Sequence, residues 1–172
     1  MWWILLAAVL LALVAYIWTL AVRIDRLHRR VATARGGLEL ALVKRAACSM
    51  QLATSGLLPR RDAEALTEAA NGSLAAIEDT WRPPRFLAES ALSRALRQVC
   101  TPEQSELICS TDLGRALWNE LAEARYRLQI SRTLYNQDVS LVQELRARRL
   151  VRFLHLAGFA PLPSYVDLDD AS

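Results

Sequence analysis

Three polar side chains near the C-terminal end of the sequence have types and spacing suited to binding or to organising a core. Arg132 precedes Tyr135 by three residues and Asn136 by four, so all three share one side of a helix. A buried guanidinium, phenol and amide need partners on neighbouring helices, and Glu39 and Glu123 are candidates for Arg132. We expect a structural polar layer that fixes helix register. A small polar ligand pocket and a solvent-exposed cluster are the alternatives.

The other reactive side chains lack the spacing of a catalytic or metal site. His28 and His155 have no partner at metal-ligand spacing, and the sequence contains no HExxH, GxGxxG or GxxxxGK[ST] motif. Cys48, Cys100 and Cys109 are odd in number and irregularly spaced, which is typical of free thiols in a reducing compartment. We therefore expect no enzyme, with no catalytic residue, no metal and no cofactor.

The helices that position these residues begin with an apolar segment. Residues 1–22 contain no charged side chain and would span ~33 Å as a helix, enough for a hydrocarbon core of ~30 Å. Trp2, Trp3, Tyr16 and Trp18 lie toward its two ends, where aromatic rings favour the membrane interface. No basic residue precedes the segment, unlike in a cleaved signal peptide. We predict an uncleaved, single-pass membrane anchor.

The charges that follow this segment predict its orientation. Arg23, Arg26, Arg29 and Arg30 stand against the single acid Asp25. Because basic flanks stay in the cytoplasm, we expect the N-terminus outside the cell membrane and the remaining chain inside.

Beyond residue 22 the apolar residues recur with helical spacing, and no strand pattern is found. No helix breaker separates Val22 from Arg23, so the anchor should continue into a helix whose seam is spaced 3-4-3-4-3 from Ile24 to Ala41. Gly36-Gly37 weakens this helix and allows a close contact or a bend. The second helix is predicted from Asp62 to a point before the proline pair in Arg82–Arg85, and the third from Phe86 to Cys100. The last helix is predicted from Thr101 to about Leu156, with an apolar stripe over Leu113–Leu145. A second possible start of this helix lies at Ser110–Asp112.

The simplest arrangement that buries all these stripes is all-α, with the transmembrane helix followed by an antiparallel four-helix bundle. The predicted divisions are a transmembrane helix over residues 1–22, a cytoplasmic helical bundle over 23–157, and an extended or disordered tail over 158–172. The sequence does not indicate an oligomeric state.

Two groups of arginines could contact lipid headgroups. The first group follows the anchor, and the second lies at the end of the last helix: Arg23, Arg26, Arg29, Arg30, Arg146, Arg148, Arg149 and Arg152. In an antiparallel bundle the last helix returns toward the bilayer, so both groups would face its anionic leaflet. We expect membrane lipids as a partner and no nucleic acid. A solvated helix end is the alternative for the second group.

Several of these residues also form a pattern that resembles the LemA family of bacterial membrane proteins. The resemblance covers the anchor, residues 30–46 and residues 113–167. In the first cytoplasmic helix it rests on Arg30, Val31, Ala34, Leu38 and Lys44-Arg45. In the last helix and the tail it rests on Arg132, Tyr135-Asn136, Val139, Gly158-Phe159, Pro161, Pro163, Tyr165 and Asp167. Residues 47–56 lack the internal proline of the family, and Val142-Gln143 stands where the family tends to repeat the Tyr-Asn pair. The resemblance implies a membrane-anchored four-helix bundle without an assigned active site.

We therefore expect a non-enzymatic bundle that binds an unidentified protein at the inner face of the membrane. A peripheral lipid-sensing or membrane-organising bundle is the first alternative. A small-ligand-binding bundle, with its pocket at Arg132, Tyr135 and Asn136, is the second.

Overall fold

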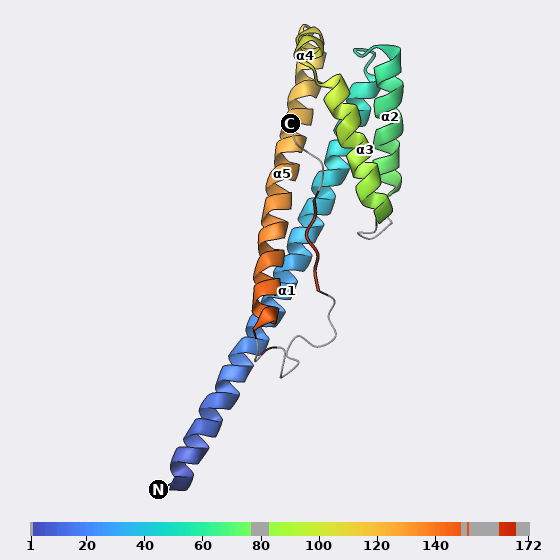
Figure 1. The fold of residues 1–172 in the computed structure, drawn as a ribbon. Helices are drawn as coiled ribbons and strands as arrows, with labels where there is room; N and C mark the ends of the chain where they lie inside the picture. The colour runs from blue at the N-terminus through green and yellow to red at the C-terminus, as the bar shows by residue number, and fades with distance from the viewer. Residues whose placement is uncertain (1, 77–82, 149–150, 152–161, 168–172) are drawn as a thin grey trace. The chain divides into compact units, whose positions relative to one another are not determined.

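The structure, a computed structural model, describes residues 2–76, 83–148, 151 and 162–167. The described residues are 88% helical, and they contain five helices and no strand. Their bounds are α1 Trp2–Thr54, α2 Arg60–Ala75, α3 Pro83–Val99, α4 Pro102–Cys109 and α5 Asp112–Ala147 (Figure 1). These bounds confirm the predicted all-α class and the long apolar N-terminal helix.

Local signals explain where the helices begin and end. Helix α1 runs without a break from the apolar segment into the basic one, as predicted. Gly56, which follows α1, has φ 77°, a conformation that glycine adopts without steric cost. Thr101 caps α4 by accepting a hydrogen bond from the Gln104 amide at 3.2 Å. The predicted limit of the last helix near Leu156 lies outside the described residues.

The chain divides into two compact units. Unit 1 comprises residues 1–35 and 134–165, and unit 2 comprises residues 36–133 and 166–172. Both α1 and α5 contribute residues to each unit. The predicted division at residues 22 and 157 stays a prediction.

Unit 1 pairs the beginning of α1 with the end of α5. Leu145 and Val151 pack against Leu20 and Ile24. The Arg30 guanidinium lies 2.9 Å from the Asp138 carboxylate. Residues later in α1 therefore meet residues earlier in α5, so the two segments are antiparallel.

The described apolar residues that precede Leu20 in unit 1 are exposed, except for Ile17, which is half-buried. This stretch of α1 is long and apolar enough to cross a membrane, and it is the single helix of that kind among the described residues. Its most apolar window of 18 residues has a mean hydropathy of 2.6, with 6% of that window buried.

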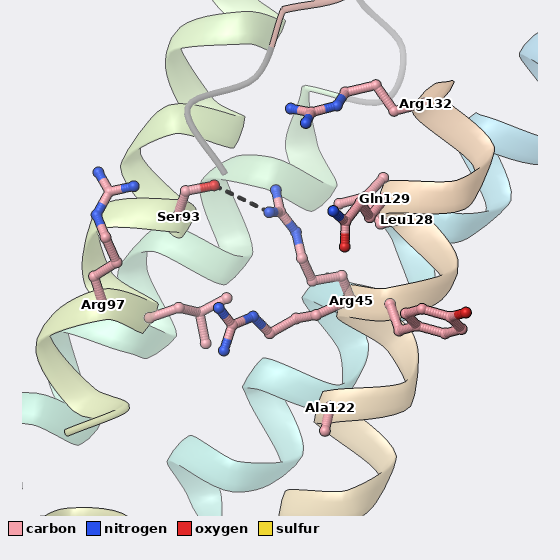
Figure 2. Close-up of a pocket in the computed structure, with 10 residues that line it drawn as sticks. Arg45, Ser93, Arg97, Ala122, Leu128, Gln129 and Arg132 are labelled. Atoms are coloured by element: carbon pink, nitrogen blue, oxygen red, sulfur yellow. Dashed lines mark hydrogen bonds between the residues drawn. The ribbon is translucent and has the colours of Figure 1, made fainter. Parts of the chain in front are cut away.

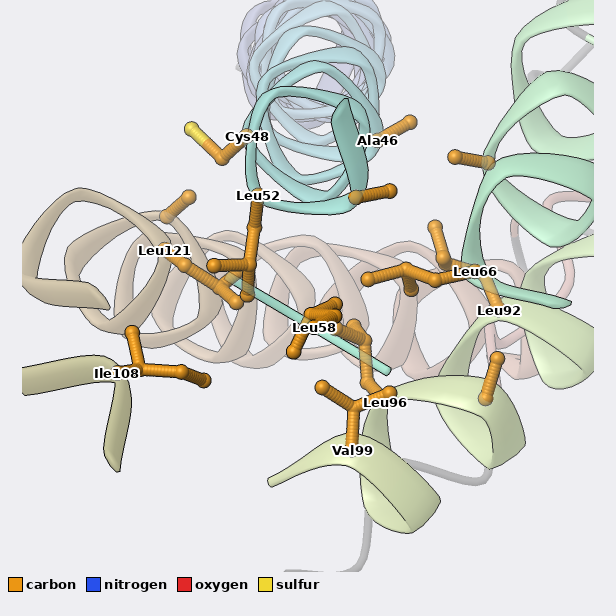
Figure 3. Close-up of a cluster of buried hydrophobic side chains, with 14 residues drawn as sticks. Ala46, Cys48, Leu52, Leu58, Leu66, Leu92, Leu96, Val99, Ile108 and Leu121 are labelled. Carbon is orange, nitrogen blue, oxygen red and sulfur yellow. The ribbon is translucent and has the colours of Figure 1, made fainter. Parts of the chain in front are cut away.

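Unit 2 contains the larger apolar core, to which all five helices contribute. Figure 3 shows its side chains converging, among them Leu52 of α1, Leu66 of α2, Val99 of α3, Ile108 of α4 and Leu121 of α5. Leu92, Leu96 and Val99 of α3 are all buried. Leu113, predicted as the first residue of the α5 stripe, is 60% exposed, which corrects that prediction.

Two glycine positions differ in what a side chain would meet. A Cβ at Gly114, in the first turn of α5, would lie 1.9 Å from the carbonyl oxygen of Ile108 and 2.8 Å from its carbon. A Cβ at Gly36 would have no described atom within 4 Å. The α4–α5 junction therefore requires a glycine. At Gly36-Gly37, where a close contact or a bend was expected, no described atom lies within 4 Å of an added Cβ.

We expect Gly114→Ala to lower the free energy of unfolding by about 1–3 kcal/mol, because backbone must move to admit the methyl group. Gly36→Ala should raise it by up to about 1 kcal/mol, since alanine favours a helix interior. Urea denaturation of the full-length protein in detergent micelles, followed by circular dichroism, measures both. Equal stabilities of the two variants would contradict the tight junction.

Candidate functional site

A buried ion pair lies within the core of unit 2. The Arg45 Nη2 of α1 donates to Glu89 Oε2 of α3 at 2.7 Å, and the two side chains are 3% and 1% exposed. Arg45 is buried because it continues the 3-4 spacing of the α1 seam, between Ala41 and Cys48. Glu89 precedes the buried Leu92 by three residues and so faces the core as well.

Two serines complete this polar network. Arg45 Nη1 donates to Ser93 Oγ at 3.0 Å, and Ser73 Oγ of α2 donates to Glu89 Oε1 at 2.9 Å. Both oxygens of the Glu89 carboxylate therefore accept a hydrogen bond. Because a buried charge is stable only with well-placed partners, the network restricts α1, α2 and α3 to one mutual register.

A cavity of about 260 Å³ adjoins this network in unit 2. Arg45 and Ser93 line it together with Arg97 from α3 and Arg125 and Arg132 from α5. Its other lining residues among those that the structure describes are Leu96, Ala122, Tyr126, Leu128 and Gln129. Figure 2 shows Arg45 between Arg97 and Arg132, with its hydrogen bond to Ser93.

The structure divides the predicted polar layer between the two units. Arg132 belongs to unit 2, where it is half-buried and lines the cavity. Tyr135 and Asn136 belong to unit 1 and do not line it. Tyr135 is buried and its hydroxyl donates to the Ser164 carbonyl at 3.1 Å, and burial raises the pKa of this phenol. A single layer formed by all three residues stays a prediction.

The predicted partner Glu123 forms a different ion pair. Its carboxylate lies 2.6 Å from Arg127, one turn along α5. Glu39 is half-buried in α1.

The predicted lipid-contacting arginines lie in unit 1 in several environments. Arg23, Arg26 and Arg148 are exposed, and Arg146 is half-buried. Arg29 pairs with Asp25 at 2.7 Å, and Arg30 pairs with Asp138, as described above. Arg149 and Arg152 lie outside the described residues.

The three cysteines are free thiols. Burial raises the pKa of Cys48, and it also raises that of Cys100, so both favour the thiol form, which is a poor nucleophile. Lys44 donates to Glu120 near Cys48, and this hydrogen bond raises the lysine pKa. The described residues contain no group of three or more His, Cys, Asp or Glu able to hold a metal ion.

The buried pair was not identified from the sequence, although a signal for it exists. Arg45 and Glu89 both occupy stripe positions, as does Ser73, three residues after the buried Ala70. A helical spacing pattern that ignores side-chain polarity predicts all three residues on the buried side of their helices.

Comparison with models of known protein families, with characterised proteins and with solved structures finds no match to this chain.

We expect Glu89→Leu alone, or Arg45→Met alone, to lower the free energy of unfolding by about 3–5 kcal/mol, because each leaves one charge buried without its partner. The double variant should recover most of this loss. Denaturation of the full-length protein in micelles measures the cycle.

Lys44→Met and Glu120→Leu form the control, because they remove a Lys–Glu ion pair whose side chains are 50% and 38% exposed. These variants should change stability little, since solvent screens exposed pairs. Additive losses in the Arg45/Glu89 cycle would contradict the proposed coupling.

Proposed function

We propose that this chain is a non-enzymatic, single-pass membrane protein whose helical domain binds another protein at the inner face of the cell membrane. The observation that carries the proposal is the change of environment along α1. Trp2 is 79% exposed and Leu5 68%, whereas Leu20 is 7% exposed and Ile24 4%. A regular helix with one exposed apolar stretch and one packed stretch suits a bilayer followed by a folded domain.

The arginines after the apolar stretch support the orientation. Arg23 and Arg26 follow the stretch directly and are exposed. By the positive-inside rule the N-terminus faces outward and the helical domain is cytoplasmic.

The packing supports an antiparallel four-helix bundle of the LemA type. The antiparallel α1 and α5 segments of unit 1 provide the long pair, and α2 packs against α3 in unit 2. On this proposal the short α4 forms the first two turns of the last bundle helix, and the Ser110–Asp112 junction separates these turns from α5. The resemblance through Arg132, Tyr135-Asn136 and Val139 supports a relation to the LemA family of bacterial membrane proteins.

An apolar groove supports protein binding. It has a volume of about 420 Å³ and lies in unit 2. Among the residues that line it, Leu40 is 71% exposed and Ile130 41%. Exposed apolar side chains beside a groove mark interaction surfaces, and an apolar helix face of a partner fits such a groove.

Lipid contact is the second candidate function, and the packing in unit 1 favours it. Leu145 and Val151 pack against Leu20 and Ile24, at the end of the apolar stretch. This contact brings the end of α5 to the expected membrane surface. Arg146 and Arg148 would then join the juxtamembrane arginines in binding anionic headgroups.

Topology is tested in a full-length variant whose three cysteines are replaced by alanine. Gln51→Cys, at an exposed position of α1, should react with a membrane-impermeant maleimide only after cells are permeabilised. Trp2→Cys should react in intact cells, because it would lie at the outer interface. Labelling of Gln51→Cys in intact cells would overturn the orientation.

Protein binding is tested by placing a photo-crosslinking amino acid at Leu40 or Ile130 in the full-length protein, in cells. Both positions should give the same discrete crosslinked product, and Ile130→Glu should reduce the product formed from Leu40. Arg94, exposed on α3 and outside the groove, is the control position. Identical products from all three positions, or none from the groove positions, would contradict the proposal.

A further inference from the structure

We propose that Tyr135 and Gln143 of α5 form a binding site for an extended, proline-containing peptide segment. Residues 162–165 of the chain itself occupy this site in the structure. The inference rests on the proposed binding of another protein, because it assigns to that partner a segment of the same kind. It adds a site apart from the apolar groove.

The segment that occupies the site is extended for local reasons. Residues 162–165 belong to unit 1 and contain no helix, strand or turn, and Figure 1 shows residues 162–167 as an elongated trace. Pro163 fixes its own φ near −65°, and a residue that precedes a proline, such as Leu162, favours extended backbone. An extended chain of this kind forms no hydrogen bonds within itself, so its carbonyl groups can accept from another element.

Two side chains of α5 donate to neighbouring carbonyl groups of this segment. Gln143 Nε2 donates to the Pro163 carbonyl at 2.8 Å, and the Tyr135 hydroxyl donates to the Ser164 carbonyl at 3.1 Å. The two donors are eight residues apart, which is about 12 Å along a helix axis. The acceptors belong to consecutive residues, whose Cα atoms are ~3.8 Å apart. The two side chains therefore converge on the segment from different levels of α5.

Both acceptors are main-chain groups, so the two hydrogen bonds do not select side chains. Within the segment, Leu162 is 57% exposed and Tyr165 50%, and Ser164 is exposed as well. Another chain with the same backbone conformation could accept the same two hydrogen bonds. Sites of this type obtain affinity from main-chain hydrogen bonds, as in other recognition of extended peptides. The ligand is therefore defined by its extended, proline-containing backbone.

The donors persist at neutral pH, and the segment is displaceable. Burial raises the pKa of Tyr135, so its phenol stays protonated and able to donate. Gln143 does not titrate. Half-exposed side chains on the segment indicate a local stability below that of the core. A competing peptide must still exceed the effective concentration of a tethered segment, which is of millimolar order.

The test measures release of the segment in the purified full-length protein in an uncharged detergent. The three cysteines are replaced by alanine, and Tyr165→Cys carries a nitroxide spin label at a half-exposed side chain that forms neither hydrogen bond. The line shape of the electron paramagnetic resonance spectrum separates a slow, bound label from a mobile, released one. The label should be predominantly slow in this parent protein.

Tyr135→Phe combined with Gln143→Leu should raise the ratio of released to bound segment by about tenfold, because two hydrogen bonds are lost. Tyr126→Phe combined with Gln137→Leu is the matched control, since it changes the same residue types at exposed positions of the same helix. It should leave the ratio within about twofold. Circular dichroism confirms that each variant is folded.

Exchange is tested with a synthetic peptide that has the sequence of residues 161–167. It should release the labelled segment of the parent in a saturable manner, with half release at a concentration of millimolar order. The same peptide with alanine in place of both prolines should require severalfold more, because it is less preorganised in the extended form. A mobile label in the parent, equal effects of the two double variants, or no release by the peptide would overturn the site.

A final arm concerns the partner. In cells, Tyr135→Phe combined with Gln143→Leu should reduce the crosslinked product formed from Leu40 severalfold, whereas the control pair should not. An unchanged product, together with release by the peptide in the purified protein, would show that the site serves the chain's own segment alone and would overturn its assignment to the partner. Absence of any crosslinked product would contradict the groove instead, because release is measured without a partner.

Discussion

The buried pair between Arg45 and Glu89 is the constraint on which unit 2 depends. Apolar contacts are non-directional, so the leucine stripes of α1, α2 and α3 alone would tolerate sliding of one helix along another. A guanidinium and a carboxylate out of contact with water tolerate no such sliding, because separation leaves an unpaired charge in a medium of low polarity. Ser73 and Ser93 add a second hydrogen bond to each charged group. The register of three helices is thereby coupled to four polar side chains.

The same pair connects the core with the cavity. Arg45 lines the cavity and Glu89 does not, so the negative member of the pair is directed into the core. The buried Glu89 carboxylate stabilises Arg45 at the cavity wall and offsets the desolvation free energy of this guanidinium. Arg97, Arg125 and Arg132 surround the same space from α3 and α5.

Helix α1 has an exposed part and a packed part, and the two parts differ in how their apolar residues are distributed. Its first part is apolar on every side and exposed, and its continuation is apolar only along a seam that packs in units 1 and 2. Leu20 and Ile24 lie where the first pattern gives way to the second, and they contact Leu145 and Val151. On the proposed membrane topology, this contact lies at the inner surface of the bilayer. The folded domain would then begin directly at the headgroups, with no linker between.

The sequence by itself determined the features that depend on local interactions. The all-α class, the Thr101 cap of α4 and the inward faces of α3 and α5 follow from helical period and from hydrogen bonds between residues a few positions apart. The tertiary structure alone decided which polar residues are buried and what they contact. Arg45 meets Glu89 44 residues away, and Tyr135 donates to Ser164 29 residues away. Leu113 has the right period but is exposed, because burial also requires a neighbouring helix at that height. Periodicity predicts which side of a helix faces inward, whereas the partner on that side depends on how distant segments pack.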